Sequence, residues 1–162
     1  MISTRRATVA DLPAVHQLIR ESFSAMKEHS CFGADFWERG AQGLIESELS
    51  EQEFEGVYFG RGSNHFWVAV RSSDAAVVGC VGLKAESSSK AAELVRMAVS
   101  ESQRSQGVGA VLMQTLLAYA KSNGVAKVHL TTGNPRSAQF YKKHGFELYN
   151  RWLFIYMERV VV

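Results

Sequence analysis

The sequence predicts an α+β fold, a mixed β-sheet flanked by helices, in a single domain over residues 1–162. The first observation is a run of three segments rich in β-branched and aromatic residues, separated by short turns, which is typical of an antiparallel meander. The second is a strand–helix–strand segment long enough for a crossover, so its two strands should be parallel. The third is a pair of helix-like segments before the meander. The predicted order is β-α-α-β-β-β-α-β-α-β-β.

The N-terminal part is expected to form one strand and two helices. Residues 2–7 form the strand, and a helix follows over about 9–27, with Thr8 as its N-cap. The apolar residues that recur at helical spacing in it are Leu12, Val15, Ile19 and Phe23. A second helix is expected over 35–50. Its inward-facing residues are predicted to be Phe36, Leu44 and Ile45. The turn-rich segment 59–64 should be a loop.

The remaining elements alternate between strand and helix. Strands are predicted at 65–70, 76–83, 92–99, 127–132, 146–150 and 152–160. A helix should cover about 107–122 and end at Asn123-Gly124. Its apolar face is predicted to consist of Val108, Val111, Leu112, Leu116 and Tyr119. The last helix should begin after Asn134, with Pro135 at its first position, and end at Gly145.

Composition limits the functional classes. The chain has a net charge of +2 and 46% hydrophobic residues, and no clustered basic face points to nucleic acid. Its two cysteines, Cys31 and Cys80, suggest neither a disulfide framework nor a metal site. The N-terminus lacks the apolar region of a signal peptide, and the longest apolar run, at 75–83, is too short for a membrane span. We therefore expect a cytoplasmic protein with no nucleic-acid, membrane or metal partner.

The segment "RSQGVGAVLM" at 104–113 carries two glycines where a predicted strand gives way to a helix. The first turn of a helix offers unpaired N–H groups and the positive end of the helix dipole, and glycines let a phosphate approach them. Arg104 adds a positive charge beside Gly107 and Gly109. The alternative is a helix start that the glycines merely ease. Leu112 replaces the third glycine of the dinucleotide motif, and the P-loop Gly-Lys-Ser/Thr is missing.

The spacing R-x-x-G-x-G of Arg104, Gly107 and Gly109 resembles that of the GCN5-related N-acetyltransferase (GNAT) family. The segment "AELVRMAVSESQRSQGVGAVLM" is similar to the family's strand, loop and helix for acetyl-CoA. "NPRSAQFYKKHGF" at 134–146 is similar to its second signature, and "TRRATVADLPAV" to its first strand and helix. The resemblance implies a sheet splayed at its centre, of the acyl-CoA N-acyltransferase type.

The resemblance also implies how acetyl-CoA, the expected co-substrate, binds. The pantetheine arm would lie between the strands at 92–99 and 127–132, along the backbone of Met97, Ala98 and Val99. The pyrophosphate would lie on Arg104, Ser105, Gln106, Gly107, Val108, Gly109 and Ala110. Asn134 and Ala138 would lie beside the pantetheine, although Asn134 also fits a simple N-cap. The CoA 3′-phosphate would meet the charged residues Arg136, Lys142 and Lys143, although each of them taken singly fits a solvated surface charge better.

Acetyl transfer to an amine needs a base for the amine proton, and Glu93 is the candidate. Strict strand alternation places it with Val95, Met97 and Val99 on a mostly apolar face, where a partly desolvated carboxylate is a better base. A carboxylate in water at the start of the strand is an equal alternative. A relay through bound water is also open, with candidate groups His65, His129 and Glu86.

The departing thiolate is helped by a proton donor, for which Tyr141 is the candidate. It shares a helix face with Ala138, and the resemblance implies that its hydroxyl points at the thioester sulfur. A core tyrosine that packs on the sheet is the alternative. A main-chain N–H near Val99 would stabilise the carbonyl oxygen.

The sequence thus predicts an N-acetyltransferase that moves the acetyl group of acetyl-CoA to a primary amine by direct attack in a ternary complex. The alternatives are a non-catalytic acyl-CoA-binding or sensor domain and a transferase for a larger acyl-CoA; the presence of Tyr141 favours an enzyme. No motif identifies the acceptor, a small molecule or a protein amine. The carboxylates of 46–55 are expected to form a solvated helix face. A homodimer paired through the C-terminal strands is compatible with the resemblance.

Overall fold

The computed structural model describes residues 1–60, 62–151 and 154–162. They form a seven-stranded sheet in the order β1-β2-β3-β4-β5-β7-β6. The strands are β1 (Ile2–Arg6), β2 (His65–Arg71), β3 (Val77–Ala85), β4 (Ala91–Val99), β5 (Lys127–Thr132), β6 (Glu147–Arg151) and β7 (Ile155–Val160). Neighbouring strands are antiparallel, except that β4 and β5 are parallel. The predicted mixed sheet, meander and parallel crossover are confirmed.

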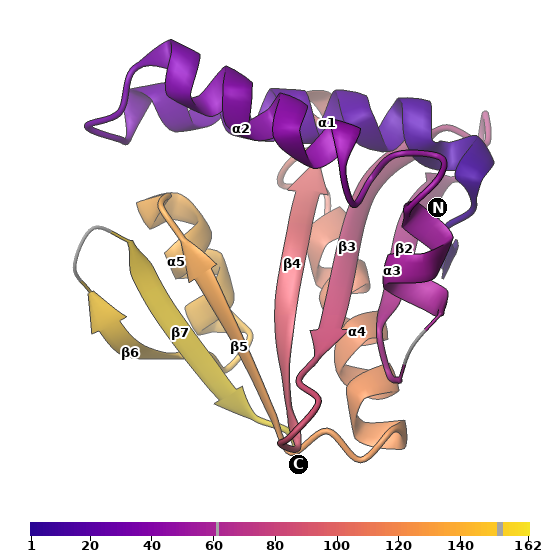
Figure 1. The fold of residues 1–162 in the computed structure, drawn as a ribbon, viewed down its shortest axis with the longest axis vertical. Coiled ribbons are helices and arrows are strands. Elements are labelled where there is room, and N and C mark those ends of the chain that lie inside the picture. Colours follow the sequence, from indigo (N-terminus) through magenta and orange to yellow (C-terminus); the bar gives the residue numbers. More distant parts are fainter. Residues whose placement is uncertain (61, 152–153) are drawn as a thin grey trace.

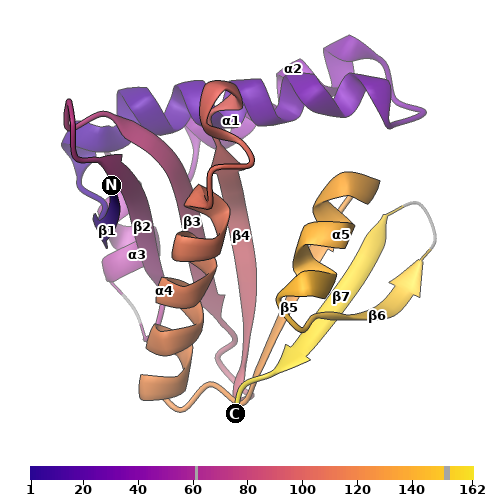
Figure 2. The ribbon, with the colours of Figure 1, turned by 180° about the vertical axis from the view of Figure 1, so that it is seen from behind.

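Helices cover both faces of this sheet (Figures 1 and 2). They are α1 (Leu12–Ala25), α2 (Ala34–Glu46), α3 (Phe54–Phe59), α4 (Val108–Ser122) and α5 (Pro135–Lys143). Helices α1 and α3 pack on β2, β3 and β4 from one side, and α2 runs along α1. Helix α4 packs on the opposite side of the same strands, and α5 covers β5 and β7 on the α4 side.

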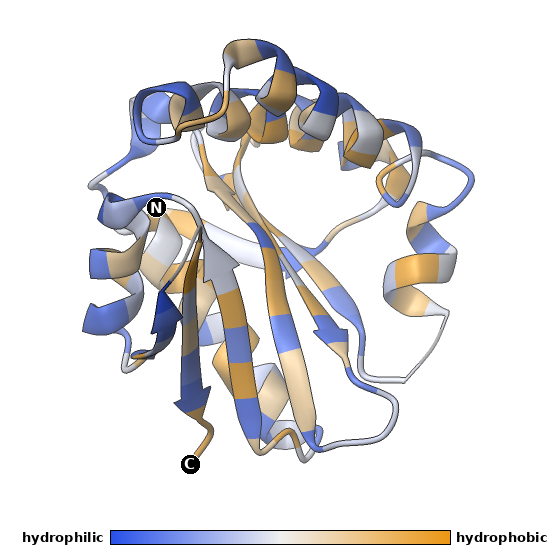
Figure 3. Ribbon diagram, turned by 60° about the vertical axis from the view of Figure 1, so that its left-hand side comes forward, coloured by the Kyte–Doolittle hydropathy of each residue, from blue (hydrophilic) through white to orange (hydrophobic). Residues whose placement is uncertain are grey.

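Each face of the sheet has its own apolar core. The core on the α1 side joins α1 and α3 to residues such as Phe66, Val68 and Val95, and the core on the α4 side joins α4 and α5 to residues such as Val81 and Leu94. Figure 3 shows that the layer of α1 and α2 turns its apolar side toward the sheet and its polar side outward. In β2, β3 and β4, the alternating side chains therefore enter two cores, one on each face of the sheet.

Three expectations for the elements are wrong. Helix α2 ends at Glu46, and a separate short helix, α3, buries Phe54 and Tyr58 where no helix was predicted. Phe36 is 43% exposed, because Trp37, one position on, takes the inward place of that helix. The last strand begins at Ile155 rather than 152, and residues 152–153 lie outside the described part of the chain.

Candidate functional site

Strands β4 and β5 are joined over a short stretch and then separate. The residues Ala91–Glu93 pair with Lys127–His129. Beyond this ladder the described strands give β4 no partner on its β5 side, although β3 stays paired with β4 as far as Val99. Figure 1 shows the two strands diverging toward the α1 and α2 layer. The central splay that the resemblance implied is therefore present, and it leaves one backbone edge of β4 open.

A bulge interrupts β4 at Arg96. Cys80 of β3 pairs with Ala98, but Gly82 pairs with Val95, so β4 carries one extra residue between these two pairs. Arg96 has a left-handed φ of 56°, which is uncommon for a residue with a side chain. Its carbonyl oxygen accepts a hydrogen bond from the buried Cys80 thiol, with the sulfur 3.3 Å away.

The bulge changes the face that the next side chains occupy. Met97 and Val99 pack against the core on the α4 side, whereas Val95 belongs to the core on the α1 side. The prediction that Glu93 shares one face with Val95, Met97 and Val99 is therefore wrong for the last two, because alternation fails at the extra residue. Glu93 itself is half-buried. The residues before and after it belong to the core on the α4 side, so its own side chain lies on the α1 side of the sheet. It pairs in register with His129 of β5.

The loop before α4 presents a row of backbone N–H groups without partners. In the described structure no acceptor is found for the N–H groups of residues 105–110, and the first bonded one is that of Val111, which donates to Gly107 O at 3.1 Å. Ser105 and Gly107 have left-handed φ values of 63° and 84°. Left-handed turns of this kind can turn successive N–H groups to one side, and here they stand at the positive end of a 15-residue helix.

The two glycines of this loop serve different purposes. Gly107 caps α4 in a conformation that side chains rarely adopt, and a Cβ there would meet no atom within 4 Å. Gly109 has an ordinary backbone, but a Cβ there would come 3.1 Å from the ring of Phe140. Gly107 therefore supplies the left-handed turn before α4, and Gly109 lets α4 pack closely against α5. Arg104 is exposed beside them, with its Nε 3.4 Å from Val99 O.

Helix α5 brings the other candidate cofactor residues to the same side of the sheet as the loop. Asn134 caps it, with its side-chain oxygen accepting from Arg136 N at 2.9 Å. Ala138 is buried, whereas Arg136 and Lys143 are exposed. The structure thus confirms the N-cap interpretation of Asn134 and the surface positions of the two cations.

Tyr141 is buried in the α4-side core. Its ring lies 5.4 Å from that of Phe140 and 5.8 Å from that of Phe146. Burial raises the pKa of its hydroxyl, because the charged phenolate would lose its water. Its hydroxyl makes no hydrogen bond within the described residues. A protonated donor without a partner is what a departing thiolate requires.

Two of the three candidate relay groups gather near Glu93. His129, its neighbour in register on β5, has Nε2 2.6 Å from Oε1 of Glu86. His65 lies on β2 instead, with its ring 4.5 Å from that of Trp67. Burial lowers the pKa of His65. Its place in this aromatic contact separates it from the opening between β4 and β5.

A charged network on the α1 side was missed by the sequence interpretation. Glu48, in the turn after α2, accepts from Tyr58 Oη at 2.7 Å and from Arg96 Nε at 2.7 Å, and it also pairs with Lys84 Nζ. Its side chain is 12% exposed, so the prediction of a solvated acidic face over 46–55 is wrong at this residue. The missing signal was its partners, which lie 10 to 48 residues away in sequence.

The electrostatics of this network keep Glu48 ionised. Burial alone would raise the pKa of Glu48, but hydrogen bonds from Arg96 and Lys84 outweigh it and lower the pKa to about 2. The pKa of Tyr58 is raised by burial and by the neighbouring Glu48 charge, so its hydroxyl stays neutral. One carboxylate thus faces two cations.

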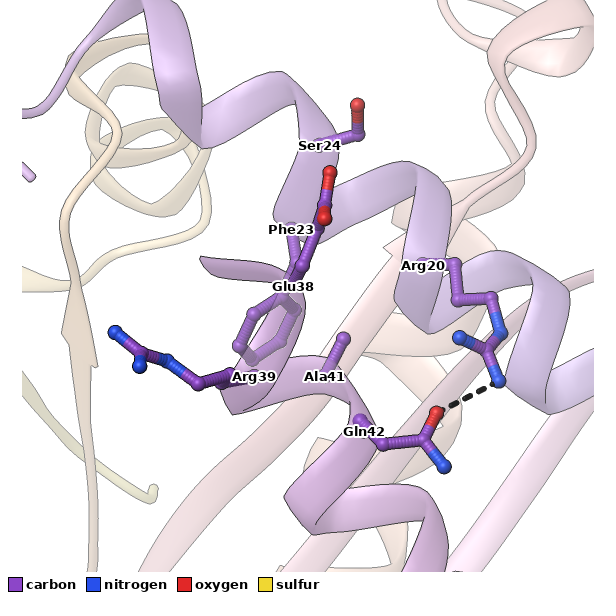
Figure 4. Close-up of a pocket in the computed structure, with 7 residues that line it drawn as sticks. All are labelled: Arg20, Phe23, Ser24, Glu38, Arg39, Ala41 and Gln42. Atoms are coloured by element: carbon purple, nitrogen blue, oxygen red, sulfur yellow. Dashed lines mark hydrogen bonds between the residues drawn. The ribbon is translucent and has the colours of Figure 1, made fainter. Parts of the chain in front are cut away.

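A hollow of about 470 Å³ lies between α1 and α2 (Figure 4). Arg20 donates to the side-chain oxygen of Gln42 across it at 3.0 Å. The residues that line it are Arg20, Phe23, Ser24, Glu38, Arg39, Ala41 and Gln42. None of them belongs to β4, β5, the glycine loop or α5, so this hollow is separate from the candidate cofactor residues.

Two further properties concern metal ions and membranes. Among residues 1–60, 62–151 and 154–162, no cluster of three or more His, Cys, Asp or Glu side chains is placed to hold a metal ion. Within the same ranges, none of the helices has the length and apolar character that crossing a membrane requires.

Comparisons with known proteins agree with this geometry. The sequence profile of the acetyltransferase (GNAT) family matches residues 12–146. The chain is 38% identical over 77 residues to a mycothiol acetyltransferase of Jonesia denitrificans, a match that covers 46% of this chain and 24% of that protein. It is 26% identical over 145 residues to an amino-acid acetyltransferase of Pasteurella multocida, covering 89% and 27%. The chain thus spans about a quarter of the length of these curated relatives.

Solved structures show the same fold. The PaiA N-acetyltransferase of Thermoplasma acidophilum, in complex with coenzyme A, superposes with a TM-score of 0.83 at 19% identity over 99% of both chains. A GNAT-family acetyltransferase of Staphylococcus aureus superposes with a TM-score of 0.76 at 16% identity over the whole of both chains.

Proposed function

The chain belongs to the acetyltransferase (GNAT) family, and we propose that it transfers the acetyl group of acetyl-CoA to a primary amine by direct attack in a ternary complex. The observation that carries this proposal is the row of unpartnered N–H groups over 105–110 at the start of α4. An exposed row of this kind binds a pyrophosphate better than any neutral ligand, because each N–H donates toward negative charge. Arg104 adds a positive charge at its edge.

The open edge of β4 supports the place of the pantetheine arm. Beyond Glu93 this edge has no strand partner in the described structure, so an extended arm has backbone groups to bond along Met97, Ala98 and Val99. The arm would then run from the loop toward the mouth between β4 and β5. Asn134 and Ala138, at the start of helix α5, would flank it from the β5 side.

The chemistry divides between the two faces of the sheet. On the α1 side, Glu93 would take the amine proton, directly or through water with His129 and Glu86 as relays. The amine nitrogen then attacks the thioester carbonyl carbon, while an N–H near Val99 stabilises the oxygen. The carbon–sulfur bond breaks, and the thiolate takes a proton from Tyr141 on the α4 side. The acylated nitrogen gives up its extra proton, which restores the Tyr141 hydroxyl through water.

The test is a titration of acetyl-CoA into the protein, followed by thiol release from acetyl-, propionyl- and succinyl-CoA with a panel of primary amines. The proposal expects acetyl-CoA binding and amine-dependent thiol release that is fastest with acetyl-CoA. Faster release with a longer acyl group would instead make this a transferase for a larger acyl-CoA. Tight binding with no amine-dependent release from any donor would indicate the non-catalytic acyl-CoA-binding domain.

A further inference from the structure

Arg96 carries hydrogen-bond donors that the protein does not use. A guanidinium has five N–H donors, and only that of Nε is occupied, by Glu48 Oε1 at 2.7 Å. For its Nη1 and Nη2 groups the described residues supply no acceptor. The side chain is only 26% exposed, so solvent reaches a small part of it. The two Nη groups form a planar fork of donors. A partly buried guanidinium whose fork has no acceptor is suited to binding a planar anion.

The charge around Arg96 also leaves room for an anion. Glu48 is a single carboxylate between two cations, Arg96 and Lys84. Tyr58 completes the network as a neutral hydroxyl. Glu93 acts on Arg96 from a greater distance, without an ion pair between them in the described structure. One positive charge in the network therefore has no directly bonded counterion.

The position of Arg96 places this fork beside the reaction. It is the bulge residue that immediately precedes Met97, where the thioester arm is proposed to lie. Its partner Glu48 lies on the α1 side of the sheet, opposite the glycine loop and α5. If the cofactor occupies the α4 side, the α1 side of the opening is left for the acceptor.

We propose that the Nη groups of Arg96, assisted by Lys84, bind a carboxylate of the acceptor, so that the substrates are amines that also carry a carboxylate group, such as amino acids. This inference rests on the proposed acetyl transfer. A carboxylate matches the site better than a phosphate because it is planar, which suits a two-pronged donor, and singly charged, which equals the unbalanced charge. Lys84 is the second cation of the network, and its positive charge attracts the same carboxylate.

The test compares acceptor pairs that differ only in a carboxylate: lysine with cadaverine, ornithine with putrescine, and phenylalanine with phenethylamine. The measured quantity is the ratio of kcat/KM for the acid to kcat/KM for its decarboxylated partner, by thiol release. We expect wild-type protein to favour the acid of at least one pair. Arg96→Met should lower that ratio roughly 10- to 100-fold, as expected for a charge-assisted hydrogen bond. Arg96→Lys should lower it less, because it keeps the charge and loses the fork.

The control is Arg71→Met, which removes an arginine from the ion pair with Asp74 in the turn after β2 and should leave the ratio unchanged. Because each ratio is measured within one protein, a partial loss of folding or a difference in amine basicity cancels between variants. A wild-type preference for the decarboxylated partners, or a ratio that Arg96→Met does not change, would overturn the carboxylate site while leaving acetyl transfer intact.

Failure of acetyl transfer itself gives a different result. If no amine releases thiol, the acids are titrated into the protein saturated with CoA and binding is measured by calorimetry. Binding that Arg96→Met abolishes and Arg71→Met preserves would support the carboxylate site alone. No binding of any acid would overturn it.

Discussion

Two groups of residues on opposite sides of β4 are built in different ways. On the α4 side, the glycine loop is one contiguous segment, 104–110, whose backbone N–H groups are left without acceptors in the described structure. On the α1 side, Glu48, Tyr58, Lys84 and Arg96 come from four separate elements and meet through side chains. The difference teaches that backbone donors can be lined up by residues adjacent in the chain, whereas a side-chain network exists only after folding has brought distant residues together.

The largest effect is expected from a substitution in the glycine loop on the α4 side. Gly107→Asp places a side chain and a negative charge where the phosphate oxygens are proposed to lie, and like charges at contact cost several kcal/mol. We expect acetyl-CoA affinity to fall by more than about 10³-fold in a calorimetric titration.

The matched control is Gly124→Asp at the other end of α4. Gly124 also has a positive φ, 72°, and a Cβ there would meet no atom within 4 Å, so the strain and the added charge are alike. Its acetyl-CoA affinity should stay close to that of the wild type. Equal losses in the two variants would show that the glycine loop is not the phosphate site.

The second prediction concerns a substitution in the charged network on the α1 side. Glu48→Gln leaves Lys84 and Arg96 without a counterion, and removing one partner of a largely buried ion pair costs about 3 kcal/mol of unfolding free energy. Acetyl-CoA affinity should change little. The control, Glu158→Gln, removes the more exposed pair with Lys127 and should cost less than about 1 kcal/mol in chemical denaturation.

This stabilisation should depend on pH in one direction. The pKa of Glu48 is lowered from 4.5 to about 2 in the folded protein, so its contribution is fully present above pH 4.5. It is lost as the pH falls from 4.5 toward 2, where the folded protein also binds the proton. The gap in stability between wild type and Glu48→Gln should therefore narrow over this window; a gap that stays constant would mean that Glu48 is not ionised in the network.

The third prediction tests Tyr141, on the α4 side. Tyr141→Phe keeps the ring and removes the hydroxyl, so turnover should fall about 10²-fold, the low end for a general acid, with little change in KM for acetyl-CoA. Because burial raises the pKa of Tyr141, its deprotonation should not shape the pH–rate profile of the wild type. Tyr119→Phe, in α4 beside Trp67, is the control. Unchanged turnover in Tyr141→Phe would leave Tyr141 as a core aromatic.

The smallest expected effect concerns Glu93. Glu93→Gln should lower turnover by less than about 10²-fold, because His129 and Glu86 lie close enough to relay the proton through water. The loss should shrink at high pH, where the amine gives up its proton unaided, and acetyl-CoA affinity should not change. Wild-type turnover across the whole pH–rate profile would make Glu93 a structural residue.

The sequence by itself determined the features that depend on neighbouring residues. Periodicity predicted the meander and the long helices, and Asn134-Pro135 predicted the start of α5 because a cap acts on the next turn of its own helix. The glycine loop was readable for the same reason: Gly107, with its left-handed φ, and the start of α4 are adjacent in the chain. A loop geometry made by consecutive residues can therefore be predicted from the sequence.

Only the tertiary structure decided the features that depend on distant residues. The bulge at Arg96 arises from its register against β3, and strict alternation therefore misplaced Met97 and Val99 relative to Glu93. Gly109 is explained by the ring of Phe140, 31 positions later in the chain. In the sequence, Glu48 is one acidic residue among several, and only the fold brings Arg96 and Lys84 next to it. A charge is stabilised by its neighbours in space, and the spacing of residues along the chain does not predict those neighbours.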